Sequence, residues 1–386
     1  MIAFDQTRLA AVLLLVLPAL SQDPSGTDER AKVAFRKLAE KFKDVRTLSA
    51  KVVQNRRSHM LRQSRPAEIR GVHVTMPLAS LPAGLDRYFA LRSHGLNTIE
   101  LDVKDESGAV AFRSKSAPLA TAIGAAKTYY NPRTVATRAH ARGIYLIGRV
   151  VTFQDPILSE ARPAYAIHNP DGSVWHNSIG LGWTNPYNRH VWQYDVDVAA
   201  AAAKAGFDEI EFDYVRFASD GDLSQIVYPG KGNRRMGPTI TGFIRYATGR
   251  LHPLGARVSA DVFGLSASHD LGIGQVPHQI GRYLDAVSPM VYPSHYTPGE
   301  LGVPDPTGQP GPIVYRSLRL FNRQMRGEKA QVVPWLQSFS LGRPYGFEDV
   351  QAQIDAARLA HVRGFLLWNP HGDYMGGTLR PYTLGR

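Results

Sequence analysis

Short runs of branched apolar residues alternate with longer stretches of helical character from Arg70 to the end of the chain. The runs predict buried strands, and the stretches, in which apolar residues recur every three or four positions, predict amphipathic helices. The predicted strands are 71–76, 98–104, 143–151, 209–217, 257–264, 286–293, 332–339 and 364–369. The predicted helices are 82–94, 132–142, 188–205, 239–252, 276–284, 313–326 and 347–362. Eight strands that alternate with helices predict the α/β class and a parallel sheet closed into a (β/α)8 TIM barrel.

The connections between these elements are asymmetric. Four of the predicted strands are entered from a helix that ends in glycine, at Gly95, Gly143, Gly206 and Gly364, and glycine readily adopts the left-handed conformation that ends a helix. The segments that follow strands are much longer, at 105–131, 152–187, 218–238 and 294–312. Because barrel active sites are built from the loops after the strands, the elaborated end of this barrel is the end where function is expected.

The first residues have the pattern of a secretory signal peptide. Arg8 precedes an apolar run at 9–20, and Ala19-Leu20-Ser21 offers small residues for cleavage near Ser21. The run is short for a membrane span, and an uncleaved anchor is the alternative. We therefore expect three parts: a signal peptide at 1–21, a helical arm and linker at 22–69, and the barrel at 70–386. The expected location is outside the cytoplasm, in the periplasm or the medium, with a membrane anchor if the signal is retained.

Residues 28–54 predict one basic helix, the N-terminal basic helical arm. Its apolar residues form a single stripe at helical spacing: Phe35, Leu38, Phe42, Val45, Leu48 and Val52. Docking on the barrel or on a partner helix is the simpler interpretation of this stripe. Attachment of its Lys and Arg residues to anionic lipid or cell-wall polymer is the alternative, and would give peripheral contact with the cell envelope.

Charge and composition narrow the classes of function. The net charge of +12 would suit a nucleic acid, but residues 1–70 hold 14 Lys/Arg against 7 Asp/Glu, and the rest of the chain holds 31 against 26. The excess lies largely in the arm, and no nucleic-acid motif accompanies it, so no nucleic-acid partner is expected. The chain has no cysteine, which excludes disulfides, thiolate zinc sites and cysteine nucleophiles.

The segment Glu209-Ile-Glu-Phe-Asp-Tyr-Val-Arg-Phe217 carries carboxylates with a period of two. Side chains alternate between the faces of a strand, so Glu209, Glu211 and Asp213 are expected on one face and apolar groups on the other. An ordinary buried strand does not carry such a row. We expect the acidic face to line the barrel interior and Asp213 to lie at its open end.

Other predicted strands also end in polar or aromatic residues, where a barrel interior is normally filled by branched apolar side chains. These candidates are His73, Thr75, Glu100, Asp102, Lys104, Arg149, Asp261, Tyr292, Trp335, Gln337, Trp368, Asn369 and His371.

Paired carboxyl groups beside aromatic rings are typical of a glycosidase active site. One carboxylic acid protonates the leaving oxygen, and a second carboxylate attacks the sugar or activates water. We expect Asp213 to be the nucleophile or base and Asp261 to be the acid. Asp102 and Glu211 are the alternative candidates for the second role. The expected substrate-binding residues are His73, Lys104, Arg149, Tyr292, Trp335, Gln337, Trp368 and Asn369.

Structural interpretations of the same residues stay open. Asp213 and Arg216 could form an ion pair, and Asp102 could pair with Lys104 or Arg149. His73 could be a core histidine, and the two tryptophans could merely close the barrel.

Seven segments, at 70–75, 97–105, 147–151, 211–217, 259–264, 288–293 and 368–370, resemble the bacterial putative glycoside hydrolase domain family. Phe212-Asp-Tyr-Val-Arg-Phe217 is the most specific of them. The resemblance implies a barrel distantly similar to the alpha-amylase superfamily, a polysaccharide-like substrate and a catalytic role for Asp213. Alpha-amylase relatives place a glutamate acid after the fifth strand, where this sequence has Asp261.

Two other functions fit the pattern. A non-catalytic carbohydrate-binding barrel or envelope scaffold would keep the aromatic residues and need no acid–base pair. A metal-dependent hydrolase usually presents closely spaced histidines, whereas His73 is followed two residues later by Thr75; calcium could still bind structurally near Asp220 and Asp222. No cofactor is expected, and the chain has no nucleotide-binding glycine loop. It also lacks the Gly-x-Ser-x-Gly nucleophile elbow.

Overall fold

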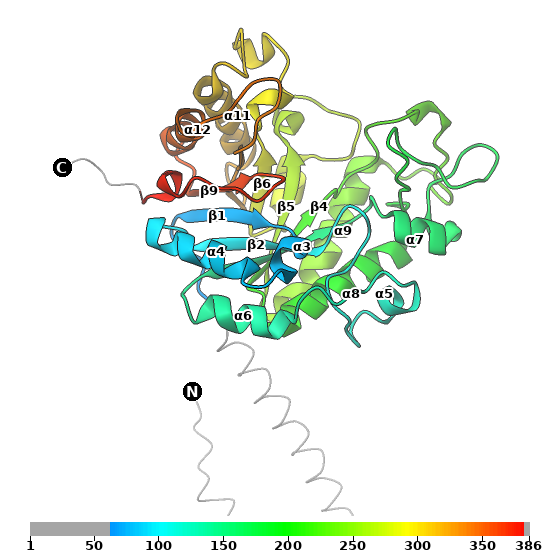
Figure 1. Ribbon diagram of the computed structural model, residues 1–386. Helices are drawn as coiled ribbons and strands as arrows, with labels where there is room; N and C mark the ends of the chain where they lie inside the picture. Colours follow the sequence, from blue (N-terminus) through cyan, green and yellow to red (C-terminus); the bar gives the residue numbers. More distant parts are fainter. Residues whose placement is uncertain (1–61, 382–386) are drawn as a thin grey trace, which may run out of the picture. The chain divides into compact units, whose positions relative to one another are not determined.

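Parallel strands close into a barrel in the computed structural model, which describes residues 62–381 (Figure 1). The strands are β1 (Ile69–Val74), β2 (Thr98–Lys104), β3 (Tyr145–Val151), β4 (Glu209–Asp213), β5 (Arg257–Phe263), β6 (Ala286–Met290), β7 (Gln331–Val332), β8 (Trp335–Gln337) and β9 (Gly364–Trp368). They follow the order β5-β4-β3-β2-β1-β9-β8-β6-β7, and the pairing of β5 with β6 closes the ring. The predicted (β/α)8 barrel is confirmed.

The seventh predicted strand is split in two. β7 and β8 are separated by Val333 and Pro334, and both run beside β6. Proline has no N–H to donate to a sheet, so the ladder is interrupted at this position. Counted as one position around the ring, β7 and β8 give the eight strands that the sequence predicts.

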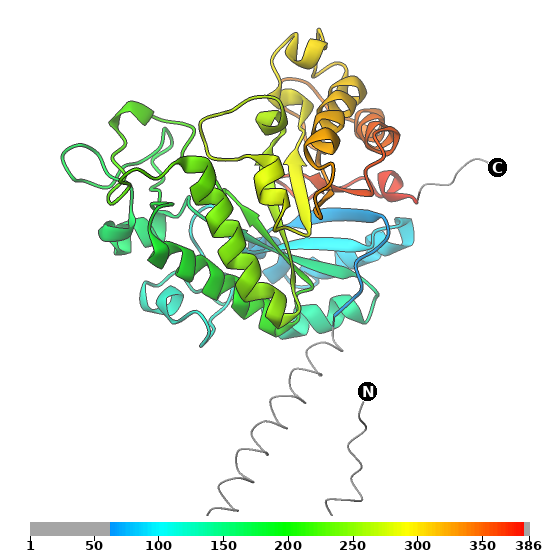
Figure 2. The ribbon, with the colours of Figure 1, turned by 180° about the vertical axis from the view of Figure 1, so that it is seen from behind.

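Helices surround this sheet, as the two opposite views show (Figures 1 and 2). They are α3 (Met76–Ser80), α4 (Gly84–Ala90), α5 (Pro118–Ala122), α6 (Pro132–His140), α7 (Pro156–Ala161), α8 (Arg189–Ala205), α9 (Met236–Leu251), α10 (Pro277–Gly281), α11 (Pro310–Gln324) and α12 (Phe347–Leu359). The longest, α8, begins at Asn188, whose side chain accepts a hydrogen bond from the His190 N–H, and ends at Gly206 with φ 115°. Gly206 is the end signal that the sequence predicts, and Asn188 satisfies an N–H of the first turn as a helix cap.

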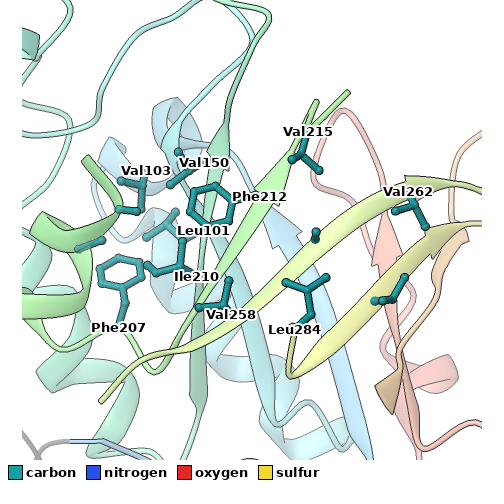
Figure 3. Packing of buried hydrophobic residues seen from close by; sticks show 14 of the residues in the cluster. Leu101, Val103, Val150, Phe207, Ile210, Phe212, Val215, Val258, Val262 and Leu284 are labelled. Carbon is teal, nitrogen blue, oxygen red and sulfur yellow. The ribbon is translucent and has the colours of Figure 1, made fainter. Parts of the chain in front are cut away.

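The main apolar core lies between the outer face of the sheet and these helices. Leu101, Val150, Ile210 and Phe212 point outward from neighbouring strands into this layer (Figure 3). The ring of Phe212 packs edge-on against Phe243 of α9, with 5.2 Å between ring centres. The apolar positions that alternate with the carboxylates of β4 are therefore the ones that hold the helices in place.

The inner face of the sheet carries polar layers instead of a purely apolar filling. At one level Tyr145 donates its hydroxyl to Glu209 Oε2 at 2.8 Å. Further along the strands, Arg149 is level with Asp102 on one side and Glu211 on the other. Because all strands are parallel, their carboxyl ends bring the last of these polar side chains to a single end of the barrel.

The long loops leave the strands at that same end. They follow β2, β3, β4 and β6, as the sequence predicts. Within residues 62–381, no helix combines the length and apolar character that a membrane crossing needs. The expected signal peptide and the whole of the basic arm lie outside the described residues.

Candidate active site

A cavity of about 530 Å³ opens at the carboxyl end of the barrel. Six of the predicted residues line it: Arg149, Asp213, Asp261, Tyr292, Trp335 and Trp368. They come from β3, β4, β5, β8 and β9 and from the residues just after β6. The cavity therefore collects side chains from at least five separate strands at one point, as the polar strand ends predict.

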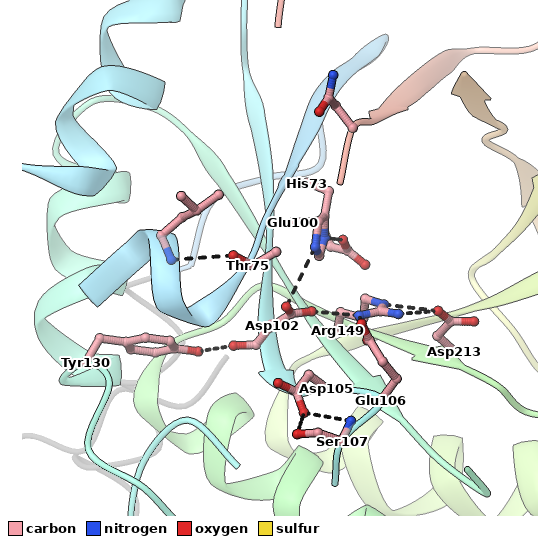
Figure 4. Close-up of polar contacts among 12 residues, drawn as sticks. His73, Thr75, Glu100, Asp102, Asp105, Glu106, Ser107, Tyr130, Arg149 and Asp213 are labelled. Carbon is pink, nitrogen blue, oxygen red and sulfur yellow. Dashed lines mark hydrogen bonds and ion pairs between the residues drawn. The ribbon is translucent and has the colours of Figure 1, made fainter. Parts of the chain in front are cut away.

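Asp213 is the last residue of β4, and its carboxylate is held from two sides. Oδ2 accepts hydrogen bonds from Arg149 Nε at 3.0 Å and Nη2 at 2.7 Å, while Oδ1 accepts one from the Tyr214 N–H at 2.6 Å (Figure 4). Together these contacts fix the orientation of the carboxyl group. Asp213 is 7% exposed and borders the cavity, so it is a positioned carboxylate within reach of a ligand.

The chain turns sharply after Asp213. Tyr214 has a φ of 50°, in the left-handed region that residues with a side chain seldom adopt. Such a conformation costs about 1–3 kcal/mol and is found most often at functional sites. Here it directs the backbone N–H of Tyr214 at the carboxylate of the residue before it.

Arg149 connects the carboxylates of neighbouring strands. Besides Asp213, its guanidinium donates to Asp102 Oδ1 at 2.8 Å and to Glu106 Oε2 at 3.2 Å. Its carbon Cζ lies 5.1 Å from the ring centre of Trp368, within cation–π range. The predicted ion pair between Asp102 and Arg149 is thus present. Asp102 does not border the cavity, so it can affect the site only by holding Arg149.

Asp261 differs from Asp213 in its surroundings. It is 2% exposed, and Trp335 Nε1 donates a hydrogen bond to its Oδ1 at 2.7 Å. Burial raises the pKa of Asp261 well above its usual value, and the neighbouring acids Glu211, Asp213 and Glu100 raise it further. Of the two carboxyl groups at the cavity, Asp261 therefore favours its neutral form, whereas Asp213 is held by the guanidinium of Arg149.

Below the cavity, Glu100, Glu211 and Asp261 form a buried cluster. One carboxylate oxygen of each lies within 4.8 Å of the other two. Burial first, and the neighbouring acids after it, raise the pKa values of Glu100 and Glu211 well above the usual range. Arg149 is the nearby cation, and it is occupied by other acids, so protonation of the cluster avoids buried unpaired charge.

The same three oxygens could hold a hard divalent cation. Calcium and magnesium prefer oxygen ligands, and the set contains no nitrogen or sulfur donor that would favour zinc. This cluster is distinct from Asp220 and Asp222, the loop residues near which the sequence analysis allowed a structural calcium ion.

His73 supports the site from behind. Its Nδ1 lies 2.5 Å from Glu100 Oε2, and its ring is stacked on Trp368 with 4.2 Å between ring centres. Burial lowers the pKa of His73 to about 4, so the imidazole is neutral near pH 7. His73 is thus a buried histidine that fixes the orientation of a cavity-lining tryptophan.

Lys104 is a correction to the sequence-based expectation. It points out of the barrel, where Nζ is 2.7 Å from Asp155 and 2.8 Å from Asp195, in a fully buried network under α8. The register between β2 and β3 shifts between Asp102 and Lys104, which reverses the side-chain alternation at the end of β2. Neither the barrel interior nor the cavity contains Lys104.

Gln337 and Asn369 were also expected to bind substrate. Their side chains instead form hydrogen bonds with backbone groups. Gln337 accepts from the Ser294 N–H and donates to the Phe339 carbonyl. Asn369 donates to the Ser338 carbonyl and accepts from the His371 N–H. They fix the loops at the rim of the barrel and do not line the cavity.

Sequence reasoning missed a group of cavity residues that lie at the ends of the strands or in the segments that follow them. Arg216 was considered only as an ion-pair partner of Asp213, but it lies in the cavity wall and Arg149 takes that role. The remaining residues are Tyr214, Phe263, Gly264, Leu265, Leu271, Gln275, Met290, His295 and Tyr296. Several of them lie in loops, where no periodicity indicates which side chain faces inward.

The sequence model of a family described as putative glycosyl hydrolase domain matches residues 71–374. No curated protein matches the chain. A hypothetical protein from Ruminiclostridium thermocellum ATCC 27405 is 33% identical, over 50% of this chain and 97% of its own, with a TM-score of 0.46.

Two further solved structures are more distant in sequence. The glycoside hydrolase domain of PgaB (BpsB) from Bordetella bronchiseptica is 15% identical and covers 82% of this chain and 100% of its own, with a TM-score of 0.56. A GH20 exo-beta-N-acetylglucosaminidase from Vibrio harveyi in complex with N-acetylglucosamine is 14% identical and covers 78% of this chain and 50% of its own, with a TM-score of 0.52. At these identities the likenesses show the fold.

Proposed function

The chain belongs to the putative glycosyl hydrolase domain family, and we propose that it cleaves a glycosidic bond of a polysaccharide with Asp213 and Asp261 as the paired catalytic carboxyl groups. The observation that carries this proposal is their contrast at one cavity. Asp213 is held by Arg149 and a backbone N–H, whereas Asp261 is buried with a raised pKa. Glycoside hydrolysis requires one charged and one protonated carboxyl group on either side of the scissile bond.

Asp213 acts as nucleophile or as general base. Its Oδ2 is held by two nitrogens of Arg149, so the carboxylate keeps its orientation while charge builds up on the sugar. The oxocarbenium-like transition state is positive, and a fixed carboxylate stabilises it.

Asp261 acts as general acid. A carboxyl group that stays neutral near pH 7 can deliver its proton to the leaving oxygen, and burial beside other acids has that effect here. Trp335 holds Oδ1 through its indole N–H, which leaves Oδ2 as the oxygen free to carry the proton.

Aromatic side chains supply the sugar-binding surfaces. Trp335, Trp368 and Tyr292 border the cavity, and flat apolar rings pack against the C–H faces of sugars. The ring of Trp368 contacts both the ring of His73 and the Arg149 guanidinium, so its orientation is fixed before a ligand binds.

Export is part of the proposal. The apolar segment after Arg8 supports a secreted bacterial enzyme that meets its polysaccharide in the periplasm or outside the cell. The basic arm supports peripheral contact with an anionic cell envelope.

A polysaccharide screen tests the function. Wild type and the Asp213→Asn variant are incubated with a panel of bacterial and plant polysaccharides, and newly formed reducing ends are measured. We expect product with wild type alone, and melting curves establish that the variant is folded at the assay temperature. Glycan binding without product at any enzyme concentration would instead support the non-catalytic carbohydrate-binding barrel, and equal product from both proteins would reject the role of Asp213.

A further inference from the structure

Arg216 is a buried cation in the wall of the candidate active-site cavity. It is 6% exposed, and no carboxylate oxygen of residues 62–381 lies within 4.0 Å of its guanidinium. Buried arginines are nearly always paired, because an unpaired charge away from water is costly. The missing partner of Arg216 is therefore a feature that needs an explanation.

Aromatic rings hold the guanidinium in place. Its carbon Cζ lies 4.7 Å from the ring centre of Phe263 and 5.0 Å from those of Trp183 and Tyr214. Cation–π contacts of this kind stabilise the charge without using any of its hydrogen-bond donors. The arrangement fixes the group and leaves its N–H donors available.

One edge of the guanidinium is engaged and another is free. Nη1 donates to the Phe217 carbonyl at 3.1 Å and to Ser219 Oγ at 2.8 Å. Nε and Nη2 have no acceptor among the described residues, and neither is among their fully buried unpaired atoms, so both keep some accessible surface. Because Arg216 is otherwise buried and lines the cavity, that surface faces the cavity.

The free Nε–Nη2 edge has the geometry that binds a carboxylate. These two N–H groups are parallel and match the two oxygens of a carboxylate in a fork-like contact. Arg149 turns the same edge toward a carboxylate in this cavity, although its Nε and Nη2 both donate to one oxygen, Oδ2 of Asp213. Asp213 and Asp220 attract Arg216 only from beyond ion-pair distance.

We infer that Arg216 binds a carboxylate carried by the substrate, so that the polysaccharide contains an acidic sugar such as a uronic acid. This inference rests on the proposed function for its location, since the acidic sugar would lie beside the bond that Asp213 and Asp261 cleave. It adds the chemical class of the sugar, which the two catalytic carboxyl groups leave open.

Ligand-observed NMR titration tests the inference without catalysis. The probes are methyl glucuronoside, methyl glucoside and methyl glucoside 6-sulfate, which differ only in the group at C6. We expect wild type to bind the glucuronoside about tenfold or more tighter than the glucoside, and Arg216→Gln to weaken glucuronoside binding about 10- to 100-fold while leaving the glucoside unchanged. Arg216→Lys keeps the charge without the fork and should lose about tenfold.

A matched control removes the same charge elsewhere. Arg189 also stacks on an aromatic ring, Trp192 at 3.6 Å, but does not line this cavity. Arg189→Gln should change neither affinity, and melting curves establish that each variant is folded. Equal binding of glucuronoside and glucoside by wild type, an equal loss of both in Arg216→Gln, or preference for the sulfate over the carboxylate would overturn the inference.

The binding result is separate from the test of hydrolysis. If no polysaccharide is cleaved but Arg216 selects the glucuronoside, the proposed function fails and the carboxylate site stands. If neutral polysaccharides are cleaved and Arg216→Gln leaves their turnover and all probe affinities unchanged, the hydrolase stands and the carboxylate site fails.

Discussion

Trp335 donates its indole N–H to Asp261 Oδ1 at 2.7 Å, from the strand that lies two positions away around the barrel. This bond ties the proposed acid to a ring that also lines the sugar-binding cavity. A donor to a carboxylate favours its charged form, so Trp335 moderates a pKa that burial raises.

Replacing Trp335 by Phe should therefore change the pH dependence of catalysis. Without the N–H donor, the charged form of Asp261 loses support and its pKa rises further, which keeps the acid protonated to higher pH. We expect the alkaline limb of the kcat/KM profile to move to higher pH and the free energy of unfolding to fall by about 1–3 kcal/mol. Trp368→Phe is the control, because it leaves the bond to Asp261 intact. An unmoved alkaline limb in Trp335→Phe would count against Asp261 as the acid.

The buried cluster predicts how stability depends on pH. Glu211 has a pKa raised by burial and by Glu100, so its neutral form is favoured in the folded protein. The stabilising contribution of a group with a raised folded pKa is complete below its unfolded pKa, about 4.3, and is lost as the pH rises through the folded pKa. Glu211→Gln removes that loss. We expect the melting temperature of Glu211→Gln to exceed that of wild type by an amount that grows from pH 5 to pH 9.

The exposed Glu348 offers a matched control for this measurement. Glu348→Gln makes the same substitution at an exposed side chain, and its melting curves serve as the reference for the effect of the substitution itself. A wild-type curve parallel to that of Glu211→Gln would mean that Glu211 is charged in the folded protein.

The three carboxyl groups also predict the response to a chelator. If Glu100, Glu211 and Asp261 are kept neutral by protons, removal of divalent cations changes neither the melting temperature nor the rate of hydrolysis. Dialysis against EDTA followed by a melting curve checks this. A lower melting temperature that calcium or magnesium restores in wild type, but not in Glu211→Gln, would locate a cation in the cluster.

Lys104 predicts a loss of stability without a change at the site. Lys104→Met leaves Asp155 and Asp195 buried without their cation, which should lower the free energy of unfolding by about 3–5 kcal/mol. Denaturant unfolding measures the effect, and Lys127→Met, at an exposed position, serves as the control. If Lys104→Met has normal stability but a raised KM, Lys104 binds substrate as the sequence predicts.

The contrast between Lys104 and Asp213 shows what the sequence could predict. Alternation along a strand correctly directed Asp213, Glu211 and Arg149 inward, because those strands keep their register with their neighbours. At the end of β2 the register with β3 shifts, and the local sequence pattern does not predict that shift. The barrel itself was predictable because its strands, helices and long loops are each determined by local periodicity and length.

The position of Arg216 could not be predicted from the sequence. Arg216 follows Asp213 by three residues and was a natural ion-pair partner on spacing alone. The left-handed conformation of Tyr214 changes the direction of the chain between them, so Arg216 meets three aromatic rings instead of the carboxylate. Backbone conformations outside helices and strands depend on tertiary packing, and the sequence pattern does not encode them in a readable form.

The assignment of Asp213 and Asp261 to different steps is tested most directly with two leaving groups. Each variant is assayed on a natural glycoside, whose leaving oxygen needs a proton, and on a dinitrophenyl glycoside of the same sugar, whose leaving group departs without one. We expect Asp261→Asn to lose about 10²–10⁴-fold on the natural glycoside and to keep most of its activity on the dinitrophenyl glycoside, while Asp213→Asn loses activity on both. Equal losses of Asp261→Asn on the two substrates, or a fully active Asp213→Asn, would contradict the account.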